Sequence, residues 1–188
     1  MEIRKFRDDE LEEIVSMTCE HMTGGDLIAE GVRKSYAEGN LYAYKVIEDN
    51  ETIGFISFKE GIEFTVPHPE ITEEIEKLYG HKRVFYGDAV WVSPKARNKG
   101  IGTKLLHIMF DGLVEAGADY LMNEYWIYPG GKSKILPLSN VFGEPLYRKL
   151  VPGFYSELDK YGMSCPICGK KCKCSAEIIM YEMKGERT

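Results

Sequence analysis

Apolar and polar residues recur along the chain with two different periods, and these periods predict alternating strands and helices. Residues 1–6 alternate, which is typical of a short strand, and the next apolar residues fall at helical spacing after an N-cap at Asp8 or Asp9. The later predicted elements are a helix from Asp26 to about Ala37, a hairpin over 41–61 turning at Asp49-Asn50, a short helix within 66–80, a strand within 83–94, a helix ending near Gly117, a strand within 119–128, a helix from about Ser139 to Lys149, and strands within 154–163 and 175–184.

This order of elements predicts an α/β (α+β) fold with a mixed, mostly antiparallel central sheet of about seven strands flanked by helices. A chain of 188 residues can bury one core, so we expect a single domain over residues 1–188. A cysteine-rich loop over 164–175 lies between the last two predicted strands, as an insertion in a terminal hairpin.

The net charge and the apolar content narrow the classes of partner. The formal net charge of −6 argues against non-specific binding to nucleic acid or to an anionic membrane surface. No apolar run approaches the ~20 residues that cross a bilayer. The first ten residues are highly charged and contain no apolar signal segment, so we expect a cytoplasmic protein. One local group of positive charge stands out, formed by Lys95, Arg97, Lys99 and Lys104.

That basic group surrounds a glycine-bearing turn between a strand and a helix. The strand ends in Val92-Ser93-Pro94, and the pattern R-x-x-G-x-G follows over residues 97–102. Free N–H groups at a helix start bind anions, and glycine lets the backbone approach them closely, so phosphate is the expected guest. The spacing does not fit the nucleoside-triphosphate loop, and Leu105 stands where the dinucleotide fingerprint needs glycine.

The turn resembles the acyl-coenzyme A site of the GNAT (GCN5-related N-acetyltransferase) superfamily, whose pattern is V-x-P followed by [QR]-x-x-G-x-[GA]. A second resemblance is Asn140 followed by Gly143, Tyr147 and the pair Gly153-Phe154, although glycine replaces the usual alanine and the last gap is longer. The resemblance implies the acyl-CoA N-acyltransferase fold and acetyl-coenzyme A as cosubstrate. It implies coenzyme contacts from Val90, Trp91, Val92, Arg97, Asn98, Lys99, Gly100, Ile101, Gly102, Thr103 and Asn140.

The resemblance further implies direct transfer of the acetyl group to a primary amine. Tyr147 matches the family's usual acid, which would protonate the departing thiolate, and a backbone N–H near Val92 would stabilise the oxyanion. The base is open, because Tyr86 stands where the family often has glutamate. Asp88, two residues along the same strand, is the first replacement candidate and Glu124 is the second, and a base acting through water is a third route.

Four cysteines form the pattern C-x2-C-x3-C-x-C, at Cys165, Cys168, Cys172 and Cys174. Four thiolates suit tetrahedral Zn²⁺, and the first pair has the spacing of a zinc knuckle. We expect structural zinc, with an iron–sulfur cluster or a set of redox-active thiols as the alternatives. A catalytic zinc is not expected, because four protein ligands leave no open position.

Two readings of the function follow. The first is an acetyl-coenzyme A-dependent N-acetyltransferase acting on an amine that the sequence does not identify. The second is a binding module on the same scaffold that senses acyl-coenzyme A or a metal without turnover, which the absence of glutamate at Tyr86 favours. Pairing through terminal strands is frequent in the family, which makes a homodimer a candidate assembly.

Overall fold

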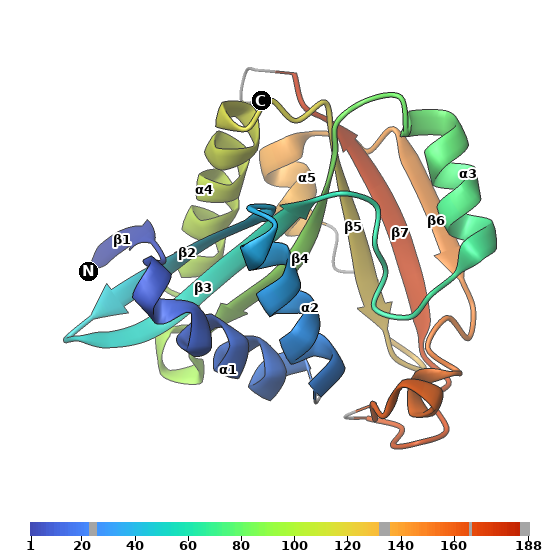
Figure 1. The fold of residues 1–188 in the computed structure, drawn as a ribbon, viewed down its shortest axis with the longest axis horizontal. Coiled ribbons are helices and arrows are strands. Elements are labelled where there is room, and N and C mark those ends of the chain that lie inside the picture. The colour runs from blue at the N-terminus through green and yellow to red at the C-terminus, as the bar shows by residue number, and fades with distance from the viewer. Residues whose placement is uncertain (23–25, 132–135, 166, 185–188) are drawn as a thin grey trace.

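A computed structural model describes residues 1–22, 26–131, 136–165 and 167–184 (Figure 1). The strands are β1 (Glu2–Lys5), β2 (Leu41–Glu48), β3 (Glu51–Glu60), β4 (Val84–Val92), β5 (Tyr120–Ile127), β6 (Tyr147–Val151) and β7 (Ser175–Glu182). The helices are α1 (Leu11–Met22), α2 (Asp26–Ala37), α3 (Pro69–Tyr79), α4 (Ile101–Glu115) and α5 (Leu136–Phe142). Short 3-10 helices lie at Asp8–Glu10 (η1), Pro94–Ala96 (η2) and Leu158–Tyr161 (η3).

The strands form one seven-stranded sheet in the order β1-β2-β3-β4-β5-β7-β6. Every neighbouring pair is antiparallel except β4 and β5, which run parallel. The prediction of a mixed, mostly antiparallel sheet of about seven strands is therefore confirmed. None of the helices in the described ranges is long and apolar enough to cross a membrane.

The parallel pair β4–β5 separates halfway along its length, and this split is the main feature of the sheet. Pairing runs from Val84 opposite Tyr120 to Gly87 opposite Asn123 and then stops. Beyond that point β4 stays paired with β3, β5 stays paired with β7, and the two strands diverge (Figure 1). The register between β3 and β4 shifts at Asp88, whose backbone has no residue paired opposite it on β3. Such a bulge bends a strand, and here it turns β4 away from β5.

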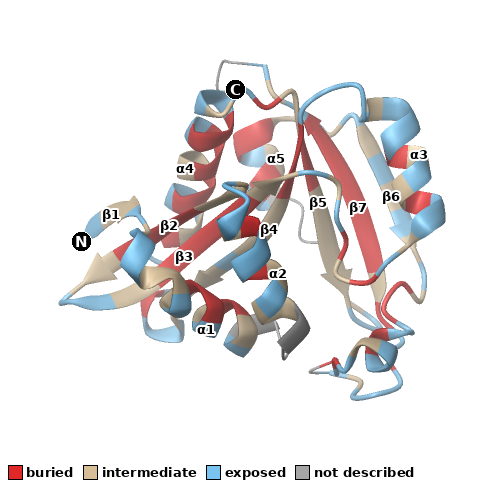
Figure 2. Ribbon diagram, in the orientation of Figure 1, coloured by how far each residue is buried: buried red, intermediate tan, exposed pale blue. Residues whose placement is uncertain are grey.

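Helices cover both faces of the sheet, and a buried cluster lies under each face (Figure 2). On one face, Leu105 and Met109 of α4 pack with Phe85 and Leu121 from the two central strands. On the other face, α3 packs over Tyr86, Met122 and Met180, and α1 and α2 pack over β2. The split between β4 and β5 therefore lies between α4 on one face and the layer of α1, α2 and α3 on the other. Within that second layer, α1 and α2 lie to one side of the split and α3 to the other (Figure 1).

The helix predicted from Ser139 to Lys149 is wrong in its second half, because α5 ends at Phe142. Gly143 takes a φ of 80°, outside the helical range, and Pro145 has no N–H with which to continue a helix. Residues 147–151 then alternate between partly buried and exposed side chains and pair with β7. Tyr147 consequently lies on the edge strand β6.

The strand predicted over residues 154–163 is also wrong, because this segment consists of turns and η3. Gly153 and Gly162 take φ values of 66° and 71°, which reverse the chain at both ends. Phe154 and Tyr155 are both buried although they are consecutive, so their side chains do not alternate across a sheet. The segment instead packs on the sheet face covered by α3, within the same buried cluster as Tyr86 and Met122.

Candidate active site

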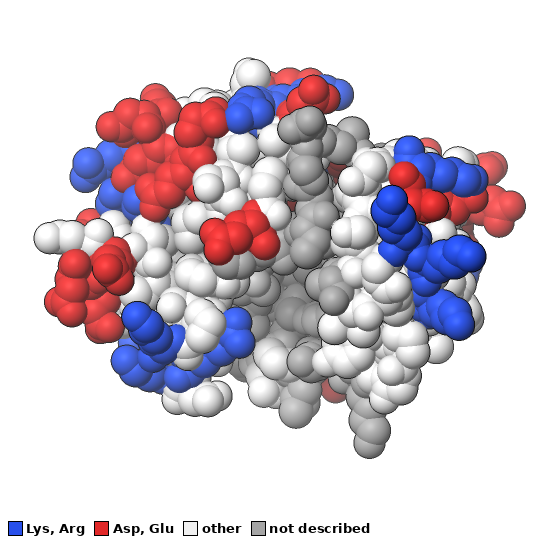
Figure 3. Space-filling model, turned by 90° about the horizontal axis from the view of Figure 1, so that it is seen from below, with Lys and Arg blue, Asp and Glu red and all other residues white. Residues whose placement is uncertain are grey.

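The turn before α4 has the geometry of an anion site. Asn98 and Gly100 take left-handed φ values of 62° and 75°, and Gly100 caps α4. The first N–H groups of a helix have no partner within it, and those of α4 adjoin a cavity of about 470 Å³. A Cβ atom built on Gly100 or Gly102 would meet no atom within 4 Å, so this side of the turn is open. In Figure 3, Lys and Arg side chains gather on the side of the lower face where α4 begins.

Three adjoining cavities connect this turn to the opposite face of the sheet. The turn cavity is the one of about 470 Å³ beside α4, with Gly100, Gly102 and Thr103 in its lining. The split cavity, of about 240 Å³, lies between the diverging strands and shares Val90, Leu106, Tyr125 and Leu138 with the turn cavity. The α2 cavity, of about 440 Å³, is lined by α2 and residues 63–67 and shares Thr65, Tyr86 and Asp88 with the split cavity.

Val90 marks the open edge of β4. Its side chain is 55% exposed, which is high for an apolar residue in the middle of a sheet, and it lines both the turn and split cavities. Beyond Gly87, the edge of β4 that faces β5 has no strand partner in the described chain. An extended ligand can pair with such an edge through main-chain hydrogen bonds. Arg97 supports the same edge, because its Nε donates to the carbonyl of Val92 at 3.1 Å.

Glu124 projects from β5 into the split cavity and is held by three donors. The Tyr155 hydroxyl donates to Oε1 at 2.5 Å, while the backbone N–H of Thr65 and the Tyr86 hydroxyl donate to Oε2 at 3.0 and 3.4 Å. Burial raises the pKa of the Glu124 carboxyl above its ordinary value, against the lowering effect of these bonds. A carboxylate with a raised pKa accepts a proton more readily near neutral pH.

The two tyrosines beside Glu124 remain protonated at neutral pH. Burial is the largest cause that raises the pKa of Tyr86 and of Tyr155, and the nearby Glu124 carboxylate raises both further. Each phenol is therefore a proton donor that already points at a proton acceptor. Sequence reasoning named neither as a catalytic group. Tyr155 directly follows the Gly153-Phe154 pair that the sequence singled out, but the strand predicted there concealed it.

Tyr86 and Asp88 both line the split cavity and the α2 cavity. Asp88 lies at the bulge of β4. Its Oδ2 accepts from the Ser57 hydroxyl at 2.9 Å, and its Oδ1 lies 3.5 Å from Nζ of Lys59. Burial lowers the pKa of Lys59, but Asp88 and Glu63 raise it more, so the net pKa is raised. Asp88 therefore lines these cavities, and a cation and a hydroxyl already engage its oxygens.

Tyr147 and Asn140 lie away from these cavities. Strand β6 is two positions beyond β5 in the sheet order, or roughly 10 Å at the usual spacing of ~4.8 Å. The Tyr147 hydroxyl donates to Oε1 of Glu74 on α3 at 2.9 Å, and Tyr147 lines none of the three cavities. Asn140 is exposed on α5, whereas Pro137 and Leu138 of that helix line the turn cavity. In this structure neither side chain lines the cavities beside which its predicted role would be performed.

The four cysteines of the C-terminal loop come together. Their sulfur atoms all lie within 4.8 Å of one another, and Cys174 Sγ is 3.7 Å from the Sγ atoms of both Cys165 and Cys168. Tetrahedral zinc with bonds of ~2.3 Å would space its sulfurs by about 3.8 Å. The N–H groups of Cys168 and Cys174 point at Sγ of Cys165 and Cys172, at 3.3 and 3.4 Å. The donor set therefore fits a tetrahedral metal, although Pro166 of this loop lies outside the described residues.

Comparison with known sequences identifies a family. A family model described as the acetyltransferase (GNAT) family matches residues 8–125, which is more than half of the chain. Among curated protein sequences, none matches this chain.

Several solved structures share the fold over nearly the whole chain. NAA60 of Arabidopsis thaliana in complex with acetyl-CoA matches with a TM-score of 0.64 and 14% identity, covering 97% of this chain and 98% of that one. An N-acetyltransferase from Staphylococcus aureus matches with a TM-score of 0.62 and 11% identity, with the same coverage. An IAA acetyltransferase from Bacillus cereus matches with a TM-score of 0.59 and 16% identity, covering 96% and 98%. At these identities the likeness concerns the fold.

Proposed function

The chain belongs to the acetyltransferase (GNAT) family, and on this premise we propose that it transfers an acetyl group from acetyl-coenzyme A to a primary amine. The observation that carries the proposal is the set of adjoining cavities through the sheet. It joins the glycine-bearing turn on one side to the partly buried carboxylate of Glu124, and then to a second opening beside α2. Two substrates entering from opposite faces would meet beside Glu124. The bound acetyl-CoA of the Arabidopsis structure with the same fold adds support.

In this proposal the coenzyme occupies the turn and split cavities. The N–H groups from Asn98 to Thr103 bind the pyrophosphate, and Arg97 and Lys99 add positive charge nearby. The pantetheine arm runs along the free edge of β4 and bonds the main chain of residues 90–92, covering the exposed side chain of Val90. The thioester then lies in the split cavity, and the amine approaches through the α2 cavity.

We assign the base to Glu124 in place of Asp88. As the neutral amine attacks the thioester carbonyl, the C–N bond forms and the amine proton passes to Glu124. Collapse of the tetrahedral intermediate breaks the C–S bond, and the thiolate takes a proton from Tyr86 or Tyr155. Glu124 then returns its proton to that tyrosine, so the site ends in its starting state. Both phenols donate to Glu124, which supports this exchange.

A direct experiment combines coenzyme binding with turnover. Acetyl-coenzyme A and coenzyme A should raise the melting temperature whereas ATP and NAD should not, and a panel of amines should then be screened for thiol release. Glu124→Gln should retain the thermal shift and lose turnover, with the exposed Glu76→Gln on α3 as the matched control. Coenzyme binding without turnover on any amine would instead favour the non-catalytic binding module.

We further propose that the four cysteines hold one structural zinc ion. The sulfur spacings and the N–H···S contacts support this assignment over a pair of disulfides, which would need S–S distances of ~2 Å. Elemental analysis of the purified protein distinguishes the metals, because an iron–sulfur cluster would bring iron and visible absorbance. An absence of both metals would favour redox thiols.

A further inference from the structure

The four-cysteine centre lies against the candidate active site. Cys165, Cys172 and Cys174 are buried in the same apolar cluster as Tyr155 and Met163, and Trp126 of β5 packs against that cluster. Cys174 immediately precedes β7, and Trp126 pairs with Ala176 on that strand. One side of the centre therefore faces the strand that carries Glu124.

Trp126 connects the cysteines to Tyr155. Cys174 lies two residues before Ala176, the strand partner of Trp126, and Trp126 packs against the apolar cluster that contains Cys174. The indole ring stacks on the Tyr155 ring, with centroids 3.9 Å apart and an interplanar angle of 10°. The Tyr155 hydroxyl in turn donates to Glu124 at 2.5 Å. The packing thus leads from the cysteine cluster to the catalytic carboxylate through two aromatic side chains.

The segment between Tyr155 and Cys165 also forms part of the opening for the amine. Tyr161 and Met163 line the α2 cavity, while Tyr155 lines the split cavity. Gly153 just before this segment and Gly162 within it take left-handed conformations, and only four residues of the segment form a 3-10 helix. Little regular structure holds it in place, so an anchor at Cys165 has a large effect on where its side chains lie.

We propose that a metal ion in the four-cysteine centre positions Glu124 through Trp126 and Tyr155, and holds the wall of the α2 cavity. This inference rests on the proposed acetyltransferase function. Trp126 and Tyr155 act here by positioning Glu124. For Tyr155 this role is separate from the donation of a proton to the thiolate. Loss of the metal should lower kcat and raise the KM for the amine, because misplacing a reacting group by ~1 Å costs up to about 100-fold in rate. Binding of acetyl-coenzyme A should persist, since no described residue of the cysteine loop lines the turn cavity.

The coupling to Trp126 can be measured without turnover. The chain has two tryptophans, Trp91 and Trp126, so Trp91→Phe leaves Trp126 as the single fluorescent reporter. Removing the metal with a chelator should shift the emission of Trp126, and one equivalent of Zn²⁺ should restore it. Co²⁺, which absorbs visible light in a thiolate site, should quench it. An emission that responds to neither ion would overturn the coupling.

The effect on catalysis is measured on the wild-type protein with and without metal. We expect kcat to fall at least tenfold on metal removal, with the thermal shift by acetyl-coenzyme A retained, and both kcat and the amine KM to recover with Zn²⁺. The same result is expected for Cys168→Ser, while Cys19→Ser on α1, outside the cluster, should match the wild type. An unchanged kcat in folded, metal-free protein would overturn the proposal.

If metal removal unfolds the protein, the metal-loaded variant Trp126→Leu tests the proposal instead. This variant removes both the stack on Tyr155 and the packing of the indole ring against the cluster that contains the cysteines. A lower kcat with an unchanged KM for acetyl-coenzyme A supports the proposal, and wild-type kinetics contradict it. A different result would contradict the proposed function. In that case the metal-loaded wild-type protein binds the coenzyme and shows the fluorescence response, but it turns over no amine.

Discussion

The Tyr155 hydroxyl donates a 2.5 Å hydrogen bond to Oε1 of Glu124, joining a turn after β6 to the strand that borders the split. This bond brings a partly buried carboxyl group and a protonated phenol together beside the cavity where the two substrates would meet. In the proposed mechanism the proton chemistry therefore lies on β5 and the 153–163 turn, away from Tyr147 on the edge of the sheet.

Glu124→Gln should reduce kcat by about 100-fold or more, the usual effect of losing a general base, with little change in the affinity for acetyl-coenzyme A. The amide keeps the shape of the side chain but cannot accept the proton. Stopped-assay measurement of thiol release gives kcat, and the thermal shift gives coenzyme binding. Asp88→Asn is the informative comparison, because a larger loss there would return the role of base to Asp88.

The pH dependence of kcat should show an acid limb that belongs to Glu124. Burial raises its pKa above the ordinary value, so the carboxyl becomes protonated and inactive at a higher pH than an exposed glutamate would. Activity should therefore rise as the pH increases through that raised pKa. In Glu124→Gln the residual activity should lose this limb. An acid limb that persists in the variant would belong to another group.

Tyr155→Phe and Tyr147→Phe should behave differently. The first removes the donor to Glu124 and should lower kcat about tenfold to 100-fold if Tyr155 supplies the proton or positions the base. The second removes the 2.9 Å bond to Glu74, which should cost about 1 kcal/mol of stability while leaving kcat nearly unchanged. Kinetics and thermal melts on the pair separate these effects. A large loss of kcat in Tyr147→Phe would contradict the present assignment.

Two glycines test which substrate uses which cavity. Gly102 lines the turn cavity and Gly31 lines the α2 cavity, and a Cβ at either meets nothing within 4 Å. The first side-chain atom of a larger residue therefore fits at either position, and a leucine there would extend into the cavity. Gly102→Leu should raise the KM for acetyl-coenzyme A, and Gly31→Leu should raise the KM for the amine. The opposite pattern would mean that the substrates enter from the other faces.

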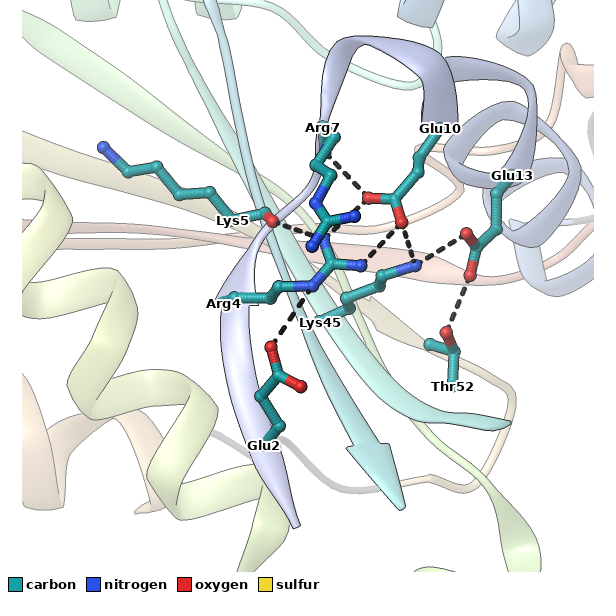
Figure 4. Close-up of polar contacts among 8 residues, drawn as sticks. All are labelled: Glu2, Arg4, Lys5, Arg7, Glu10, Glu13, Lys45 and Thr52. Carbon is teal, nitrogen blue, oxygen red and sulfur yellow. Dashed lines mark hydrogen bonds and ion pairs between the residues drawn. The ribbon is translucent and has the colours of Figure 1, made fainter. Parts of the chain in front are cut away.

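A charged network at the far end of the sheet should control stability without touching catalysis. Figure 4 shows Lys45 between Glu10 and Glu13, with Nζ–carboxylate distances of 2.9 and 2.7 Å, and Arg4 bonded to Glu10 at 2.7 Å. The hydrogen bond from Arg4 is the main cause that lowers the pKa of Glu10 well below its usual value of 4.5. Glu10→Gln should therefore destabilise the protein by about 2 kcal/mol at neutral pH.

The sign of the pH dependence checks that assignment. A carboxyl with a lowered pKa in the folded state contributes its full stability above its unfolded pKa and loses it as the pH falls toward the folded value. The difference in unfolding free energy between wild type and Glu10→Gln should thus shrink below about pH 4.5. Glu12→Gln, whose partner Arg33 is solvent-exposed, is the matched control and should change little. A difference that stays constant with pH would contradict the ionic origin.

Local features of the fold follow from the sequence. The hairpin of β2 and β3 turns where Asp49 and Asn50 take positive φ values, as that residue pair predicts. The R-x-x-G-x-G turn forms the predicted helix start at Ile101, and the spacing of the four cysteines brings their sulfurs together. In each case the interacting groups lie within a few residues of each other, so backbone preference and spacing are sufficient.

The candidate active site was decided by tertiary structure. The split exists because a bulge at Asp88 and the different outer partners of β4 and β5 pull the two strands apart, and neither effect is visible in a single strand's sequence. Tyr147 has the spacing of the family's acid, but Gly143 and Pro145 end the helix before it and pairing with β7 makes it an edge-strand residue. Glu124 acquires its raised pKa from burial and its partner from a turn 31 residues away. Sequence spacing determines which groups can meet locally. Strand pairing and burial decide which distant groups share a cavity and in which direction their pKa values shift.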